Sequence, residues 1–145
     1  MNQIYPITWE VAIDDVYFDG LKLSRSSLAA SNVTLTALLD TVRRLLGLQI
    51  ELIVRLIQGN ALIRGPRDVL DTITSQLGGD TYDCAEAHTL TFQIGGRFYP
   101  VDPRDFGAQT FEDTTSQCTP NIAPTDPPSS GFLYSWSIGD PFFKS

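Results

Sequence analysis

Apolar and polar residues alternate along much of this chain, and the alternation predicts several short β-strands. Apolar side chains occupy every second position over residues 7–13 and again over residues 90–94, which is typical of strands buried on one face. Residues 34–39 form a further apolar run of strand length. Asp-Gly at 19–20 and Gly-Gly at 95–96 follow such runs and predict tight hairpin turns. We therefore expect a mostly β fold.

Helical periodicity occurs in two segments. Residues 67–77 lie between Pro66, which suits a first helical turn, and Gly78, which suits a helix end. They predict one short helix whose buried stripe is Val69, Leu70, Ile73 and Leu77. Residues 42–58 carry basic and polar side chains on one stripe and Leu and Ile over the rest, which predicts a second, amphipathic helix. Residues 119–131 are rich in Pro and Ser and predict a loop without regular structure.

Composition narrows the function classes. The chain has 145 residues and a net charge of −7, which suits one domain and argues against a nucleic-acid partner, because that partner needs a basic surface. A single histidine and the spacing of Cys84 and Cys118 fit no zinc motif, so we expect no metal site. The two cysteines leave a disulfide or two free thiols open. The first residues do not form a signal peptide, and no apolar stretch is long and uninterrupted enough to cross a membrane.

The candidate catalytic group lies between residues 37 and 66. This segment reads Ala-Leu-Leu-Asp-Thr, then residues 42–58, then Gly-Asn-Ala-Leu-Ile-Arg-Gly-Pro. Joined without residues 42–58, the two sides place Asp40 and Thr41 directly before Gly59 and Asn60, after an apolar strand. The joined string resembles the second active-site loop of the pepsin-like aspartic proteases.

Other segments resemble the same family, and they follow one another in the family's order. Residues 9–20, from Trp-Glu-Val-Ala-Ile to Asp-Gly, resemble the opening of the C-terminal lobe. Residues 90–106 read Leu-Thr-Phe-Gln-Ile-Gly-Gly-Arg-Phe-Tyr-Pro-Val-Asp-Pro-Arg-Asp-Phe and are similar to a later hairpin of that lobe. Ile138, Gly139 and Asp140 resemble the apolar-Gly-Asp motif, whose strand threads beside the catalytic loop. The Pro after Asp140 and the Lys-Ser ending are most similar to secreted enzymes of basidiomycete fungi.

The resemblance implies a pepsin-like C-terminal lobe in which Asp40 is one of two catalytic carboxylates that activate water at acid pH. Thr41 would brace the loop by hydrogen bonding. Gly59 has no Cβ and would let backbone N–H groups approach the carboxylate. Asn60 stands where Thr or Ser is usual, and its amide can also hydrogen bond near the aspartate. The family acts on polypeptide substrates and uses neither a metal nor a cofactor.

The resemblance also implies that Cys84 and Cys118 form the disulfide of the C-terminal lobe and that the protein is secreted. In a secreted chain Asn32 would be a glycosylation site, because Asn-Val-Thr is an acceptor sequence. The chain carries one Asp-Thr-Gly half-motif, without the first lobe, its aspartate or its flap hairpin. We therefore expect residues 1–145 to form a single incomplete lobe that needs the N-terminal lobe as its partner and is inactive by itself.

Residues 42–58 have more than one interpretation. The favoured one is a retained intron, because Val codons begin with GT, Gln can be encoded by CAG, and excision restores Asp-Thr-Gly in frame. If these residues are translated, their helix could serve a partner or a membrane surface, and the chain would be a non-catalytic binding module. A homodimer that uses one Asp40 from each chain is disfavoured, because the loop is interrupted and a flap is lacking.

Overall fold

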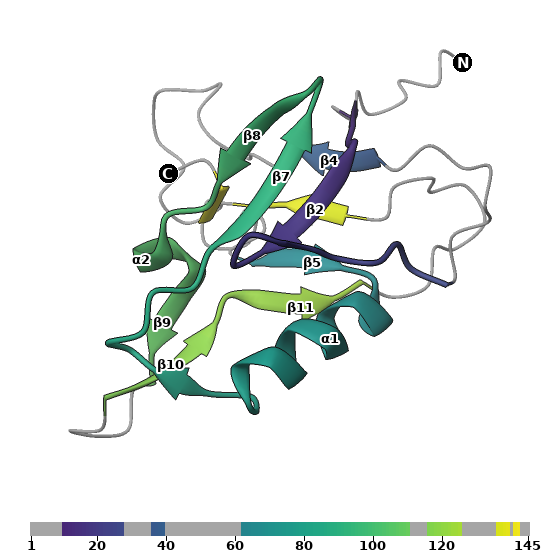
Figure 1. Cartoon of the computed structure of the whole chain (residues 1–145). Coiled ribbons are helices and arrows are strands. Elements are labelled where there is room, and N and C mark those ends of the chain that lie inside the picture. The colour runs from purple at the N-terminus through teal and green to yellow at the C-terminus, as the bar shows by residue number, and fades with distance from the viewer. Residues whose placement is uncertain are drawn as a thin grey trace, which may run out of the picture.

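The computed structural model describes residues 10–27, 36–39, 62–110, 116–125, 136–139 and 141–142 (Figure 1). Within these ranges the chain is mostly β, with three small sheets and two helices. The predicted fold class is confirmed at this level. The helix predicted over residues 42–58 lies outside the described residues.

The largest sheet has five strands in the order β1-β4-β12-β5-β11. Their bounds are β1 (Glu10–Ala12), β4 (Thr36–Leu39), β12 (Trp136–Ile138), β5 (Ile63–Gly65) and β11 (Ile122–Pro124). Strand β12 runs parallel to β4 and antiparallel to β5, while β1 is antiparallel to β4 and β11 is parallel to β5. A strand from near the C-terminus therefore lies between the two strands that flank residues 40–61.

A four-stranded antiparallel sheet has the order β3-β2-β7-β8. Its strands are β2 (Asp15–Phe18), β3 (Leu21–Lys22), β7 (Leu90–Ile94) and β8 (Arg97–Pro100). Both of its hairpin turns are the predicted ones. Asp19 and Gly20 have φ values of 48° and 79°, and Gly95 and Gly96 have 58° and 77°. Two successive positive φ values are what a two-residue turn of the favoured hairpin type requires.

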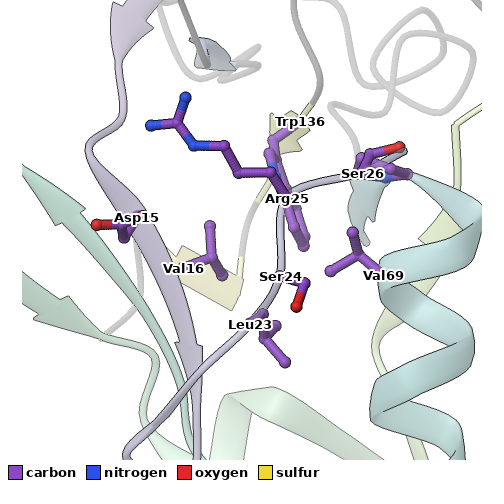
Figure 2. Close-up of a pocket in the computed structure, with 9 residues that line it drawn as sticks. Asp15, Val16, Leu23, Ser24, Arg25, Ser26, Val69 and Trp136 are labelled. Atoms are coloured by element: carbon purple, nitrogen blue, oxygen red, sulfur yellow. The ribbon is translucent and has the colours of Figure 1, made fainter. Parts of the chain in front are cut away.

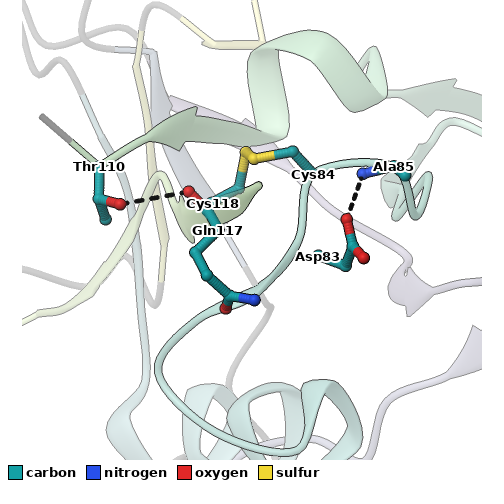
Figure 3. Close-up of a disulfide and its surroundings, with 6 residues drawn as sticks. All are labelled: Asp83, Cys84, Ala85, Thr110, Gln117 and Cys118. Atoms are coloured by element: carbon teal, nitrogen blue, oxygen red, sulfur yellow. Dashed lines mark hydrogen bonds between the residues drawn. A yellow bond between two sulfur atoms is a disulfide. The ribbon is translucent and has the colours of Figure 1, made fainter. Parts of the chain in front are cut away.

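The third sheet has the order β6-β10-β9 and contains a disulfide between Cys84 and Cys118 (Figure 3). Its strands are β6 (Tyr82–Asp83), β9 (Gly107–Gln109) and β10 (Gln117–Pro120). The two Cα atoms lie 5.1 Å apart, so the pairing that the family resemblance implied is present. The bridge closes a sequence separation of 34 residues. An entropic estimate for such a loop is about 3–4 kcal/mol of stabilisation.

The prediction of an irregular loop over residues 119–131 is wrong for its first part. Residues 119–120 end β10 and residues 122–124 form β11. The prolines are compatible with these strands because Pro120 and Pro124 are the last residues of their strands, and β11 is an edge strand of the described sheet. A strand can lose the N–H of such a residue without losing an interior ladder bond.

Helix α1 (Arg67–Leu77) has the predicted bounds and stripe. Val69, Leu70 and Ile73 are buried, and Leu77 is half-buried. Gly78 ends the helix in the left-handed region, at φ 83°, where its missing Cβ avoids strain. Helix α2 (Pro103–Phe106) was not predicted, although Asp102 and Pro103 are favourable helix-start residues, and the Arg104 N–H donates to the Asp102 side chain.

One hydrophobic core joins these elements. Strand alternation buries Val16 and Phe18 on β2 and Leu90 and Phe92 on β7. The other buried apolar side chains come from the five-stranded and three-stranded sheets, the helices and the connections: Ile13, Leu23, Ile63, Val69, Leu70, Ile73, Tyr82, Val101, Phe106, Trp136 and Ile138. Burial on this scale requires both the sheets and α1, which lies alongside β11 in Figure 1.

We predict that Gly65→Ala destabilises the fold. Gly65 lies on β5, and a Cβ there would be 2.4 Å from Cζ3 of the Trp136 ring. Overpacking of this kind typically costs about 1–3 kcal/mol in the free energy of unfolding. Urea unfolding of the two proteins measures the effect. In a Trp136→Leu background the same alanine should cost clearly less, because the clashing ring is gone. An unchanged stability of Gly65→Ala would contradict the described packing.

Candidate functional site

The candidate site is one edge of the five-stranded sheet, which we call the loop edge and define by Leu39, Ile63, Ile138 and Gly139. Strands β4 and β12 are parallel and pair Leu39 with Ile138, so both strands end at this edge. Strand β5 runs the opposite way and pairs Arg64 with Ser137, so it begins here at Ile63. Strand β4 therefore ends at Leu39 and β5 begins at Ile63. Strand β12 lies between them and ends at the same edge of the sheet.

The predicted catalytic residues adjoin this edge in the sequence. Asp40 directly follows Leu39, and Asp140 directly follows Gly139. The remaining predicted loop residues precede β5. The following predicted residues lie outside the described part of the chain: Asn32, Asp40, Thr41, Gly59, Asn60 and Asp140. Of the predicted apolar-Gly motif, the structure places Ile138 and Gly139 at the loop edge, both buried.

Strand β12 is held on both faces by packing. Trp136 is 2% exposed and Ile138 is fully buried. The Trp136 ring meets Phe92 edge-on at 5.4 Å between centroids, and its other contact is the bare Cα of Gly65. Phe92 also contacts Phe142 edge-on at 5.6 Å. These contacts fix the strand that ends at Gly139, because ring pairs of this geometry add to the burial energy.

The segment after β12 turns back at once. The Phe142 N–H donates to the carbonyl of Gly139 at 3.1 Å. Ser137 is 5% exposed on β12 and stands where the family motif has an apolar residue. The loop edge is therefore bordered by well-packed backbone on the β12 side.

An ordered carboxylate sits behind β5, at the start of α1. Asp68 accepts hydrogen bonds from the Ser26 hydroxyl at 2.8 Å, from the Ser27 N–H at 2.8 Å and from the Ser27 hydroxyl at 3.0 Å. Burial alone would raise the pKa of the Asp68 carboxyl, but these donors and the Val69 N–H together hold its pKa below the ordinary value. This cluster ties α1 to the segment after β3.

The sequence prediction missed this cluster. An aspartate in the first turn of a predicted helix and a Ser-rich segment at 24–27 were the available signals. Their pairing across 42 positions was not readable from either segment alone. With its oxygens occupied by donors, Asp68 is a structural anchor for the helix that follows β5.

A small cavity lies between this cluster and Trp136 (Figure 2). Its volume is about 10 Å³, which leaves room for one water molecule at most. Val16, Leu23 and Val69 line it, and the guanidinium of Arg25 extends away to donate to the Asp14 carbonyl at 3.1 Å. The space is a packing gap near the start of β12 and the end of β5, away from the loop edge, and is too small for a substrate.

The described residues contain neither a candidate metal site nor a helix that could span a membrane. They contain no group of three or more His, Cys, Asp or Glu side chains arranged to hold a metal ion. No helix within them is long and apolar enough to span a membrane.

Comparison with models of known protein families and with curated protein sequences found no match.

We predict that Asp68→Asn lowers the free energy of unfolding by about 1–2 kcal/mol at neutral pH, because it removes a charged acceptor from several donors. The pKa of Asp68 is depressed in the folded state, so its contribution is complete above the ordinary carboxyl range and is lost as pH falls through the lower, folded value. The gap between wild type and variant should therefore narrow below about pH 4.

Urea unfolding at pH 7 and pH 3 measures this gap. Asp71→Asn is the matched control, because Asp71 is exposed on the same helix, and it should change stability little at either pH. A gap between wild type and Asp68→Asn that is equally large at both pH values would contradict the role given to the ionised carboxylate.

Proposed function

We propose that this chain is the C-terminal lobe of a secreted, pepsin-like aspartic endopeptidase, most similar to those of basidiomycete fungi. One observation carries the proposal: β12, which leads into Ile138-Gly139, lies between β4 and β5, the strands that flank the Asp40 segment. This is the arrangement that the family motif requires, with the apolar-Gly strand threaded beside the catalytic loop. The motif order along the sequence supports the same assignment.

The reaction class follows from the chemistry of paired carboxylates. Hydrolysis of a peptide without a metal requires that one water is deprotonated and that the scissile carbonyl is polarised. Two carboxylates about 3 Å apart share one proton, so one acts as base while the other donates. In the complete enzyme Asp40 is one member of this pair. Its twin comes from the N-terminal lobe, which is the required partner, and a polypeptide is the substrate.

The strand before Asp40 supports the role proposed for that residue. It follows β4, a strand paired on one side by β1 and on the other by β12. A carboxylate next to the end of an interior strand is better fixed than one within a long loop. Thr41 braces the same loop through its hydroxyl. Gly59 and Asn60 supply a close backbone approach and a side-chain amide on the β5 side.

The disulfide supports the secreted location. Cys84 and Cys118 are bonded in the third sheet, and such bonds persist chiefly in oxidising compartments. For a secreted chain, glycosylation at Asn32 belongs to the same proposal.

We predict that the isolated chain does not hydrolyse denatured globin near pH 4, because it supplies a single member of the catalytic pair. Activity should appear when the chain lacking residues 42–58 is refolded with the first lobe of a secreted pepsin-like protease. That activity should be blocked by a pepstatin-type inhibitor. Asp40→Asn should lower it by about 1,000-fold or more, because the shared proton loses one of its sites.

Asp80→Asn is the matched control for this assay, since Asp80 is exposed between α1 and β6, and it should leave the activity of the refolded pair unchanged. Full activity of the Asp40→Asn pair would overturn the proposed role of that carboxylate. Activity of the isolated chain that rises with the square of its concentration would instead support a homodimer with one Asp40 from each copy.

Residues 42–58 are proposed to be a retained intron, because their removal restores a contiguous Asp-Thr-Gly loop between β4 and β5. We predict that sequencing of mature transcripts will join codon 41 directly to codon 59. Reads that run continuously through the segment in the mature message would contradict this and would favour a translated helix with a binding role.

A further inference from the structure

The single histidine of the chain, His88, lies between two carboxylates. Its Nδ1 is 2.7 Å from Oδ2 of Asp19, and its Nε2 is 3.3 Å from Oε2 of Glu86. Asp19 belongs to the turn between β2 and β3, whereas His88 belongs to the connection between β6 and β7. The Thr89 N–H donates to the second Asp19 oxygen at 2.8 Å. One aspartate therefore holds two adjacent residues of that connection.

The number of hydrogen-bond donors on the His88 ring decides whether both carboxylate contacts can be hydrogen bonds. An ionised carboxylate only accepts hydrogen bonds, and a neutral imidazole has one N–H donor and one bare nitrogen. In a neutral ring one nitrogen lone pair would thus face a carboxylate oxygen without a hydrogen between them. The imidazolium has a donor on each nitrogen and satisfies Asp19 and Glu86 together.

The His88 ring is partly buried between two aromatic side chains. Its side chain is 16% exposed, so water screens the contacts only in part. Phe18 stacks on the ring at 5.7 Å, and Tyr82 meets it edge-on at 5.0 Å. Aromatic faces attract cations at such distances. The titratable groups that face the ring are Asp19 from the β2–β3 turn, Glu86 from its own connection and Tyr82 from β6. Burial raises the pKa of the Tyr82 phenol, which therefore stays neutral.

We propose that His88 is a proton-operated clasp that docks the β2–β3 turn onto the β6–β7 connection in its imidazolium form and loosens when the ring is neutral. The clasp is complete where the imidazole is protonated and both carboxylates are ionised. Stability from the clasp is present while the ring carries both protons and is lost when a rise in pH removes one of them.

The clasp acts on a short segment that is already anchored at its other end. Cys84 begins the connection and is bonded to Cys118, while His88 and Thr89 hold its end against Asp19. Opening the clasp therefore frees a few residues without separating the sheets. The inference rests on Phe18, Asp19 and residues 82–89 alone, so it does not depend on Asp40 or on the protease assignment.

Nuclear magnetic resonance of the full chain, labelled with ¹⁵N in histidine and in the backbone, tests the clasp. At pH 5.5 both ring nitrogens of His88 should carry slowly exchanging protons. The protection factor of the Thr89 amide, corrected for intrinsic exchange, should fall about twofold to fivefold between pH 5.5 and pH 8, as expected for a partly exposed ion pair. Because the chain has a single histidine, the ring signals need no assignment by mutation.

Variants separate the clasp from general effects of pH. His88→Gln should show a low protection factor for the Thr89 amide at both pH values. Glu86→Gln should partly reduce the pH dependence of that protection factor. Asp80→Asn, which removes an exposed acid outside the clasp, should leave the wild-type profile unchanged. A wild-type ring with one protonated nitrogen at pH 5.5 would overturn the proposal, as would a Thr89 profile that His88→Gln leaves unchanged.

Discussion

The insertion of β12 between β4 and β5 is the constraint on which the described fold depends. Without it, β4 would keep only β1 as a neighbour and β5 only β11, and the five-stranded sheet would divide into two pairs. Its partners are far away in sequence, so closing these contacts costs loop entropy. Burial of Trp136 and Ile138 offsets that cost, because apolar area removed from water stabilises by about 25 cal/mol per Å².

The same strand connects the sheets to one another. Trp136 contacts Phe92 of the four-stranded sheet, and Phe18 of that sheet contacts Phe106 of α2 at 5.7 Å. Phe106 in turn lies 6.0 Å from Tyr82 of the three-stranded sheet. Sheets of two to five residues per strand are marginal by themselves. Aromatic contacts between them turn three weak sheets into one cooperative core. The indole also lies against Gly65 on β5, where a Cβ would collide with it.

Local features of this fold were predictable from the residues themselves, whereas non-local ones, such as the Cys84–Cys118 pairing, came only through the family resemblance or were missed. The turns at 19–20 and 95–96 and the helix over 67–77 depend on residues within a few positions of each other, so their patterns specify them. The parallel pairing of β4 with β12 and the strands at 117–124 depend on partners elsewhere, and proline content pointed the wrong way for the latter. For the site, the motif predicted Ile138 and Gly139 at a strand end, whereas Asp68 gained its role through contacts that no local pattern contains.

A fall in pH affects the stability of this fold in opposite directions through its carboxylates and its histidine. Hydrogen bonds to the Asp68 carboxyl keep it ionised below the ordinary range, and the Arg104 side chain and N–H lower the pKa of Asp102, which caps α2, to about 2. Both helix starts therefore keep their charged acceptors to a lower pH than ordinary carboxyls would allow. The clasp proposed at His88 has the opposite sign, because it needs a protonated ring. Asp68, Asp102 and His88 all lie outside the loop edge, so the response of the fold to pH is separate from the chemistry proposed for Asp40.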